Sequence, residues 1–114
     1  MLSGSKAWLW QRLSAVYLTG FTLWLIAVIG FRPPADVADW AAFWGHGGVA
    51  LATVLATAAL LMHAWIGLRD VIMDYVHPLG LRITLFTIAA FGFVVIGAWV
   101  VAILLDMRHL AGVL

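Results

Sequence analysis

An ionisable cluster follows an apolar run near the middle of this sequence. His63 comes directly after the run GGVALATVLATAALLM, and Arg69, Asp70, Asp74 and Tyr75 follow it within a few helical turns. If the run lies in a bilayer, the imidazole is costly there, and such side chains usually carry a function. A neutral imidazole commonly ligates haem iron, but it can also relay protons or hydrogen-bond a neighbouring helix.

If the segment is a helix, His63 lies on a row of small side chains that ends in two acids. The row consists of Ala52, Ala56, Ala59, His63, Gly67, Asp70 and Asp74. A strip of small residues in a membrane allows either close packing of another helix or the approach of a flat group such as haem. Both interpretations stay open from spacing alone. A haem with two histidine ligands would need a second chain, because no other histidine here lies at a matching depth.

Three more polar residues could bind a ligand. The phenol of Tyr75 can donate to a quinone carbonyl, although tyrosines are common at membrane interfaces in any case. Asp74 belongs to a charged helix end that Arg69 and Arg82 could balance. Arg12 opens the first apolar run and could bind a carboxylate such as a haem propionate, or a lipid phosphate.

The composition predicts that these residues are positioned by membrane-spanning helices. The 114-residue chain is 66% apolar and 10% charged, with a net charge of +1, whereas soluble domains are about 45–50% apolar and about 25% charged. The scattered basic residues argue against nucleic-acid binding. The absence of cysteine excludes a disulfide framework, a thiolate metal site or an iron–sulfur cluster held by this chain. The first apolar run is longer than a secretory signal core, so we expect it to remain as a span.

Three apolar runs are long enough to span a bilayer, since about 20 residues suffice. We expect spans at about 13–31, 47–68 and 83–105, in a single all-α membrane-anchor domain covering residues 1–114. The second helix should continue to about residue 76, because Pro78 disfavours helix at the residue before it. Such a helix is roughly 45 Å long and outruns a core about 30 Å thick, so Asp74 and Tyr75 should emerge from the membrane.

The first loop predicts a short helix at the membrane interface. Val37, Trp40, Ala41 and Trp44 share one helical face, with Asp36 as its cap and Gly45 as its end. Its tryptophans would lie at headgroup depth.

Basic residues near the span ends predict the orientation. Lys6, Arg12, Arg69 and Arg82 lie on one side of a three-span topology, and only Arg32 and Arg108 lie on the other. The excess of basic residues predicts a cytoplasmic N-terminus and an external C-terminus.

With these features in place, the segment HAWIGLRDVIMDYVHP resembles the His-Ala-Trp-Ile-Gly and Asp-Tyr-Val-x-Pro motif of the D-type membrane anchor of bacterial succinate dehydrogenase, complex II. WLWQRLSAVYL is similar to that family's arginine-containing entry to its first helix. The sister C-type anchor typically has a second histidine where this chain has Asp70.

The resemblance implies roles for individual residues. His63 matches the axial ligand of haem b, and the C-type cytochrome b anchor subunit would supply the other ligand. Tyr75 matches the tyrosine that hydrogen-bonds the quinone, expected to be ubiquinone, with Asp74 as its motif neighbour. Arg12 matches an arginine near the haem propionates. His77 occupies a position that is commonly basic in relatives.

The resemblance also implies an assembly. This chain would anchor a flavoprotein subunit and an iron–sulfur subunit at the bacterial cytoplasmic membrane, pack with the three-helix C-type anchor, and perform no succinate chemistry itself. Two alternatives remain at this point. The chain could be a haem-free quinone-binding anchor of the fumarate reductase type, or a small transport subunit that relays protons.

Overall fold

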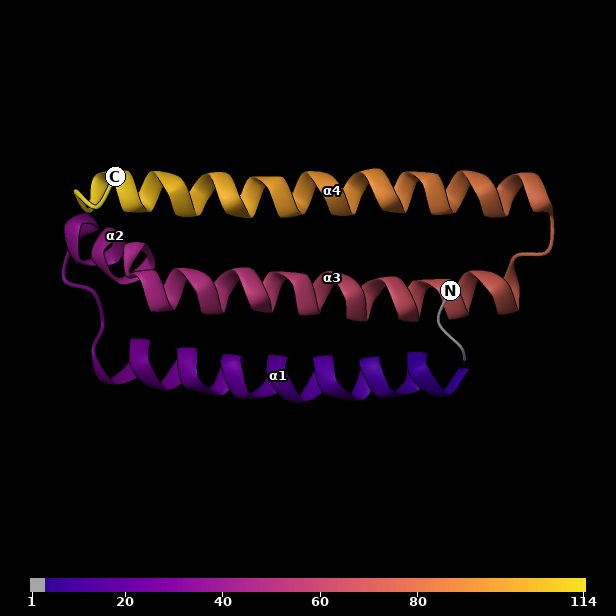
Figure 1. The fold of residues 1–114 in the computed structure, drawn as a ribbon, viewed down its shortest axis with the longest axis horizontal. Helices are drawn as coiled ribbons and strands as arrows, with labels where there is room; N and C mark the ends of the chain where they lie inside the picture. Colours follow the sequence, from indigo (N-terminus) through magenta and orange to yellow (C-terminus); the bar gives the residue numbers. More distant parts are fainter. Residues whose placement is uncertain (1–3) are drawn as a thin grey trace.

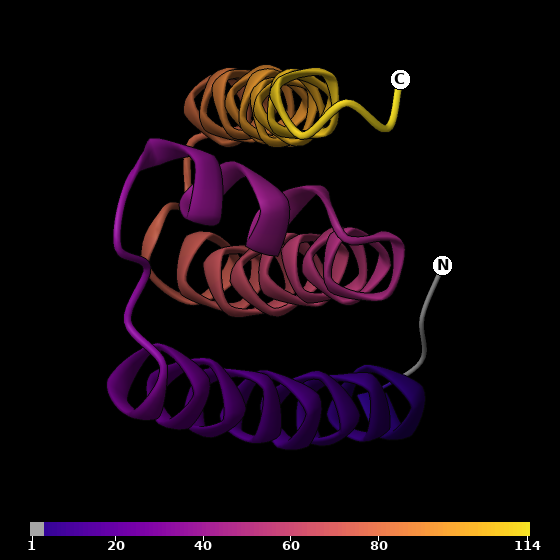
Figure 2. The same ribbon diagram turned by 90° about the vertical axis from the view of Figure 1, so that its left-hand side faces the viewer.

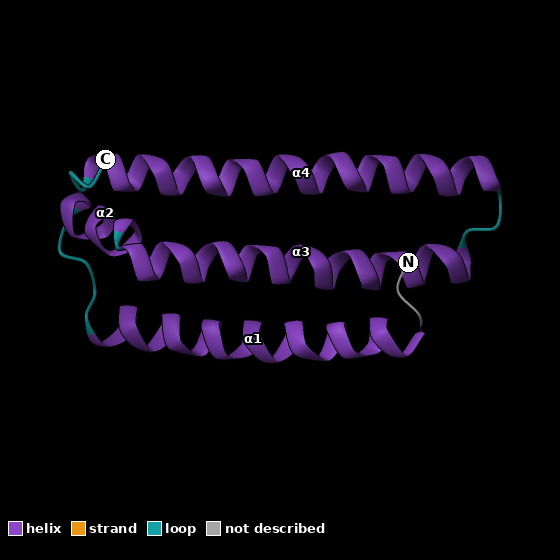
Figure 3. Cartoon of the chain, in the orientation of Figure 1, coloured by secondary structure: helices purple, strands orange, loops and turns teal. Residues whose placement is uncertain are grey.

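The computed structural model describes residues 4–114, and this part of the chain folds into helices with no strand (Figures 1 and 3). The helices are α1 (Gly4–Phe31), α2 (Val37–Gly45), α3 (Gly47–Tyr75) and α4 (Leu79–Leu110). By length and hydropathy, α1, α3 and α4 could each cross a membrane. The prediction of an all-α fold with three apolar spanning helices and a short helix in the first loop is confirmed.

The three long helices lie in one flat row with α3 in the middle. Figure 2 shows α1 and α4 on opposite sides of α3, and within residues 4–114 these two outer helices do not contact each other. The short α2 lies at the end of the row where α1 ends and α3 begins, and it packs on α3 and α4. A residue on α3 therefore faces α1, α4 or the open surface of the row.

The flat row buries few of its own side chains. Its buried apolar residues are mostly alanines, together with two isoleucines and one leucine. Large side chains such as Ile88, Phe91 and Val94 point outward from α4. Because lipid tails are as apolar as these side chains, the exposed surface suits a bilayer and needs no further covering there.

Side-chain caps set the boundaries of α2 and α3. The Asp36 carboxylate accepts a hydrogen bond from the Asp39 amide at 2.8 Å, and α2 ends at Gly45, as the sequence predicts. His46 then begins α3, because its Nδ1 accepts from the amide of Gly48 at 3.2 Å. The side-chain acceptors satisfy amides that would otherwise have no partner at a helix start.

Gly45 permits the closest contact between α2 and α4. A Cβ at this position would lie 3.1 Å from the Met107 carbonyl oxygen and 3.2 Å from the Cα of Arg108. Across the same contact, the Arg108 guanidinium donates to the Gly45 carbonyl at 2.9 Å. The absence of a side chain at Gly45 thus brings the two backbones within reach of this hydrogen bond.

The corner between α3 and α4 is held by Arg82. Its guanidinium donates to the carbonyls of Val76 and Met73, the latter at 3.0 Å. From the sequence, Arg69 and Arg82 could balance the acids at this end of α3; in the structure the Arg82 guanidinium donates to carbonyls there. A cation there also suits the negative end of the helix dipole.

Candidate functional site

His63 lies near the middle of the row and faces α1. Its Nδ1 is 3.1 Å from the Ser14 hydroxyl oxygen, and its Nε2 is 3.4 Å from the Gln11 amide nitrogen. Ser14 is buried, whereas His63 and Gln11 are half-buried. Both ring nitrogens of the imidazole thus have polar neighbours on α1, and part of the His63 residue remains accessible.

The small-residue strip is the packing seam between α3 and α1. Ala56 and Ala59 are buried, and the Tyr17 hydroxyl of α1 donates to the Ala52 carbonyl at 2.7 Å. A Cβ at Gly67 would lie 3.9 Å from the Gln11 amide nitrogen. Of the two interpretations left open by the spacing, helix packing is therefore the one that the strip itself realises. A flat group would have to approach His63 from the accessible side.

Trp65, two residues after His63, contacts α4, the helix on the other side of α3. Its ring lies 5.6 Å from the ring of Phe86 and 6.0 Å from that of Phe93, both on α4. Two residues further along a helix correspond to a rotation of about 200°. The segment His63 to Trp65 therefore joins both outer helices to α3, which fixes the rotation of α3 about its own axis.

A hollow with polar groups lies beside this site, between the first turns of α1 and the last turns of α3. Its volume is about 310 Å³, and it is lined by Gly4, Ala7, Trp8, Gln11, Ile66, Arg69 and Asp70. Gln11 borders both the hollow and His63. Sequence reasoning did not single out Gln11 or Ser14. The available signal was their spacing of three residues within an otherwise apolar helix, which puts both on one face.

The structure does not bring Arg12 or Tyr75 next to His63. Arg12 is exposed, and its guanidinium lies over the Trp8 ring at 5.2 Å. Because it follows Gln11 directly, its side chain leaves α1 about 100° away from the direction of Gln11. Tyr75 is 78% exposed at the last residue of α3, roughly 18 Å along the helix axis from His63, and Asp74 beside it is also exposed.

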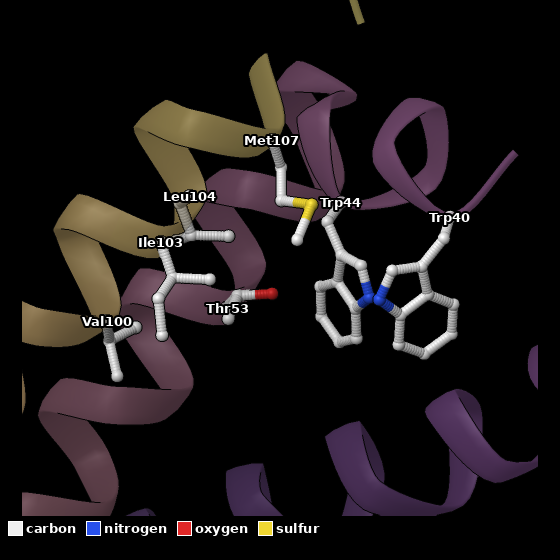
Figure 4. Close-up of a pocket in the computed structure, with 7 residues that line it drawn as sticks. All are labelled: Trp40, Trp44, Thr53, Val100, Ile103, Leu104 and Met107. Carbon is white, nitrogen blue, oxygen red and sulfur yellow. The ribbon is translucent and has the colours of Figure 1, made fainter. Parts of the chain in front are cut away.

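The opposite end of the row has an apolar hollow of about 290 Å³ beneath the tryptophans of α2 (Figure 4). Trp40 and Trp44 pack edge to face there, with ring centroids 5.6 Å apart. Figure 4 shows their side chains beside aliphatic residues of α4 and Thr53 of α3, whose hydroxyl donates to the Val49 carbonyl. The arrangement fits the interfacial anchoring role that the sequence predicts for these tryptophans.

Comparison with known proteins gives the same assignment across most of the chain. Residues 2–105 match the family described as succinate dehydrogenase/fumarate reductase transmembrane subunit. A protein of Rickettsia felis is 37% identical over 103 residues, which cover 88% of this chain and 84% of the relative. A protein of Coxiella burnetii is 26% identical over 101 residues, covering 89% and 88% respectively.

Both relatives are named succinate dehydrogenase hydrophobic membrane anchor subunit, which confirms the resemblance found in the His63–Pro78 segment. Outside the family region lie residue 1 and residues 106–114, which include the last residues of α4. This chain therefore belongs to the succinate dehydrogenase/fumarate reductase transmembrane subunit family.

Proposed function

We propose that this chain is the anchor subunit that binds haem b and completes the quinone site of a bacterial succinate dehydrogenase. The flavoprotein and iron–sulfur subunits would dock at the end of the row that carries Tyr75, and a C-type anchor would provide the second axial haem ligand. The observation that carries this proposal is His63, whose imidazole contacts Ser14 and Gln11 of α1 near mid-helix while the residue as a whole is only half-buried. Bound there, a haem supplies a store for one electron between the iron–sulfur subunit and the quinone.

The donor set around His63 suits a haem better than a bare metal ion. Among the described residues, no three His, Asp or Glu side chains gather closely enough to hold an ion. A single imidazole is sufficient for haem, because the porphyrin fills the equatorial positions of the iron. Of the other titratable side chains, Arg69 and Asp70 lie nearest along α3, bordering the hollow beside Gln11.

The exposed end of α3 suits a quinone headgroup. Reduction of a quinone to the quinol takes two electrons and two protons at its two oxygens. The Tyr75 hydroxyl can donate a hydrogen bond to one carbonyl oxygen, and its exposure leaves it accessible to a ligand and a docked subunit. Asp74 would support the site from the preceding position. Arg12, near the start of α1 at the same end of the row, is available to a haem propionate.

The distribution of basic residues supports a cytoplasmic location for this end. The start of α1, the end of α3 and the start of α4 meet at one end of the row (Figure 1). Lys6, Arg12, Arg69 and Arg82 belong to these segments, whereas Arg32 and Arg108 belong to the opposite end. By the positive-inside rule, the Tyr75 end faces the cytoplasm of the bacterial cell and the C-terminus lies outside.

The haem ligand is tested by His63→Ala in the purified complex. We expect loss of the b-type haem absorption bands, because the substitution removes the nitrogen that binds iron. His109→Ala is the matched control, since His109 is exposed at the far end of α4. A full haem spectrum in a correctly assembled His63→Ala complex would rule out His63 as the ligand.

The quinone role is tested by Tyr75→Phe. The loss of one hydrogen bond of about 1–1.5 kcal/mol should lower quinone reduction about tenfold. Succinate oxidation with a soluble artificial acceptor should persist, because that reaction bypasses the anchor. An equal decrease of both activities would contradict a specific role of Tyr75.

A further inference from the structure

We propose that Ser14 is a positioning residue for the haem ligand: its hydroxyl oxygen accepts a hydrogen bond from the Nδ1–H of His63 and thereby leaves the Nε2 lone pair for iron. The inference rests on the proposed haem-binding function. It adds a residue of α1 that fixes both the tautomer and the orientation of the imidazole. Three observations at the contact between α1 and α3 carry it.

The first observation gives the direction of the hydrogen bond between Ser14 and His63 Nδ1. The Ser14 hydroxyl donates its single proton to the Gln11 carbonyl, at 3.0 Å. Towards His63 Nδ1, at 3.1 Å, the serine oxygen therefore offers only lone pairs. Nδ1 must carry the proton for this contact to be a hydrogen bond. Since a neutral imidazole has one N–H, Nε2 is left unprotonated, which is the form that binds iron.

The second observation is the rigidity of the acceptor. Ser14 is 3% exposed and is the only polar residue among the buried ones in residues 4–114. It lies within α1, so helical hydrogen bonds fix its backbone conformation. A ligating histidine usually donates its other N–H to such a fixed acceptor, which sets the ring orientation. Ser14 supplies this acceptor from a neighbouring helix.

The third observation is the long and incomplete hydrogen bonding of the Gln11 amide. Its amide nitrogen lies 3.4 Å from His63 Nε2, at the long limit of a hydrogen bond. Its Oε1 is buried, with no hydrogen-bond partner among the described residues. The amide thus donates to the same lone pair that iron requires. Gln11 must turn aside when haem binds, and the hollow of about 310 Å³ that it borders gives it room.

The acceptor has a measurable electronic consequence. A hydrogen bond from Nδ1–H raises the basicity of the ligating nitrogen, and a more basic ligand favours ferric over ferrous iron. The removal of the acceptor should therefore raise the haem midpoint potential. A tenfold change in the preference for ferric iron corresponds to about 59 mV for a one-electron couple.

The test uses the whole complex with Ser14→Ala, which removes the acceptor, and Ser14→Thr, which keeps the hydroxyl. Haem content per flavin and the midpoint potential from a redox titration are measured for each. We expect Ser14→Ala to raise the haem midpoint potential by a shift approaching about 59 mV, the equivalent of a tenfold change in the preference for ferric iron. Haem should be retained or bound more weakly. Ser14→Thr should keep the haem content and the midpoint potential of the unmodified complex. Gln11→Ala should retain haem, because the Gln11 amide has to move away from Nε2 when haem binds.

The outcomes separate this inference from the proposed function. Loss of haem in His63→Ala together with an unchanged potential in Ser14→Ala would overturn the role of Ser14 alone. Equal haem loss in the alanine and threonine variants would indicate that packing matters and the hydroxyl does not, which also overturns it. Retention of haem in His63→Ala would instead refute the proposed ligand, whatever the serine variants show.

Discussion

Arg82→Met should loosen the end of α3 that carries Asp74 and Tyr75. The guanidinium reaches back from the first turn of α4 and donates to the carbonyls of Met73 and Val76. Met73 belongs to the last turn of α3 and Val76 is the residue that follows the helix, so no further helical amide is available to their carbonyls. Methionine keeps a long apolar stem but has no donor, so both hydrogen bonds are lost.

The expected magnitude follows from the environment of the two bonds. A hydrogen bond to a charged group contributes about 1.5–3 kcal/mol. The bond to Val76 is part-buried, whereas the bond to Met73 is exposed to solvent, so water replaces the latter at little cost. We therefore expect a loss of about 1.5 kcal/mol at this corner, which corresponds to about a tenfold change in the local opening equilibrium.

Hydrogen–deuterium exchange in the purified complex measures this opening. The amide of Val76, which donates to the Ile72 carbonyl, should exchange about tenfold faster in Arg82→Met. The KM for quinone should rise, while succinate oxidation with a soluble acceptor should not change. Arg82→Lys is the matched control, because it keeps the charge and can still reach one carbonyl. Unchanged exchange at the corner in Arg82→Met would refute this account of Arg82.

Two further predictions concern the opposite end of the row. Gly45→Ala should cost about 1–3 kcal/mol and lower the apparent melting temperature of the complex, because the new Cβ would meet the backbone of Met107 and Arg108. Gly47→Ala is the control and should leave the melting temperature unchanged, because a Cβ there would be in ordinary contact with Arg108 only. Equal melting temperatures of the two variants would contradict the close packing at Gly45. His46→Ala should remove the cap of α3 at a cost of about 1 kcal/mol, and His46→Asn should restore it, so equal stability of the two variants would argue against capping.

The fold was predictable because its signals are local. Apolar runs of sufficient length define the three spans, and Pro78 predicts that the second helix stops close to Tyr75, where α3 ends. The short α2 follows from Asp36, the apolar face containing Trp40 and Trp44, and Gly45. Each of these signals acts within a few residues, so no knowledge of the neighbouring helices is required.

The surroundings of the site were less predictable because they depend on which helices touch. Periodicity puts His63 and the alanines on one face of α3, but it does not say that α1 covers that face. Histidine is not among the usual helix-capping residues, so the hydrogen bond from the Gly48 amide to His46 could not be predicted from the sequence. The sequence shows only that Arg82 could balance nearby acids, because sequence distance does not reveal that its guanidinium reaches two carbonyls.

The central position of α3 implies that its two proposed binding residues, His63 for haem and Tyr75 for quinone, can be perturbed separately. His63 is held from α1 by Ser14, whereas the Tyr75 end is held from α4 by Arg82, roughly 18 Å away along a stiff helix. Sites this far apart with no shared partner usually contribute independently. Ser14→Ala should therefore shift the haem potential without changing the quinone KM, and Arg82→Met should do the reverse. If both variants moved both quantities, α3 would be responding as one unit, and the separate support from α1 and α4 would be wrong.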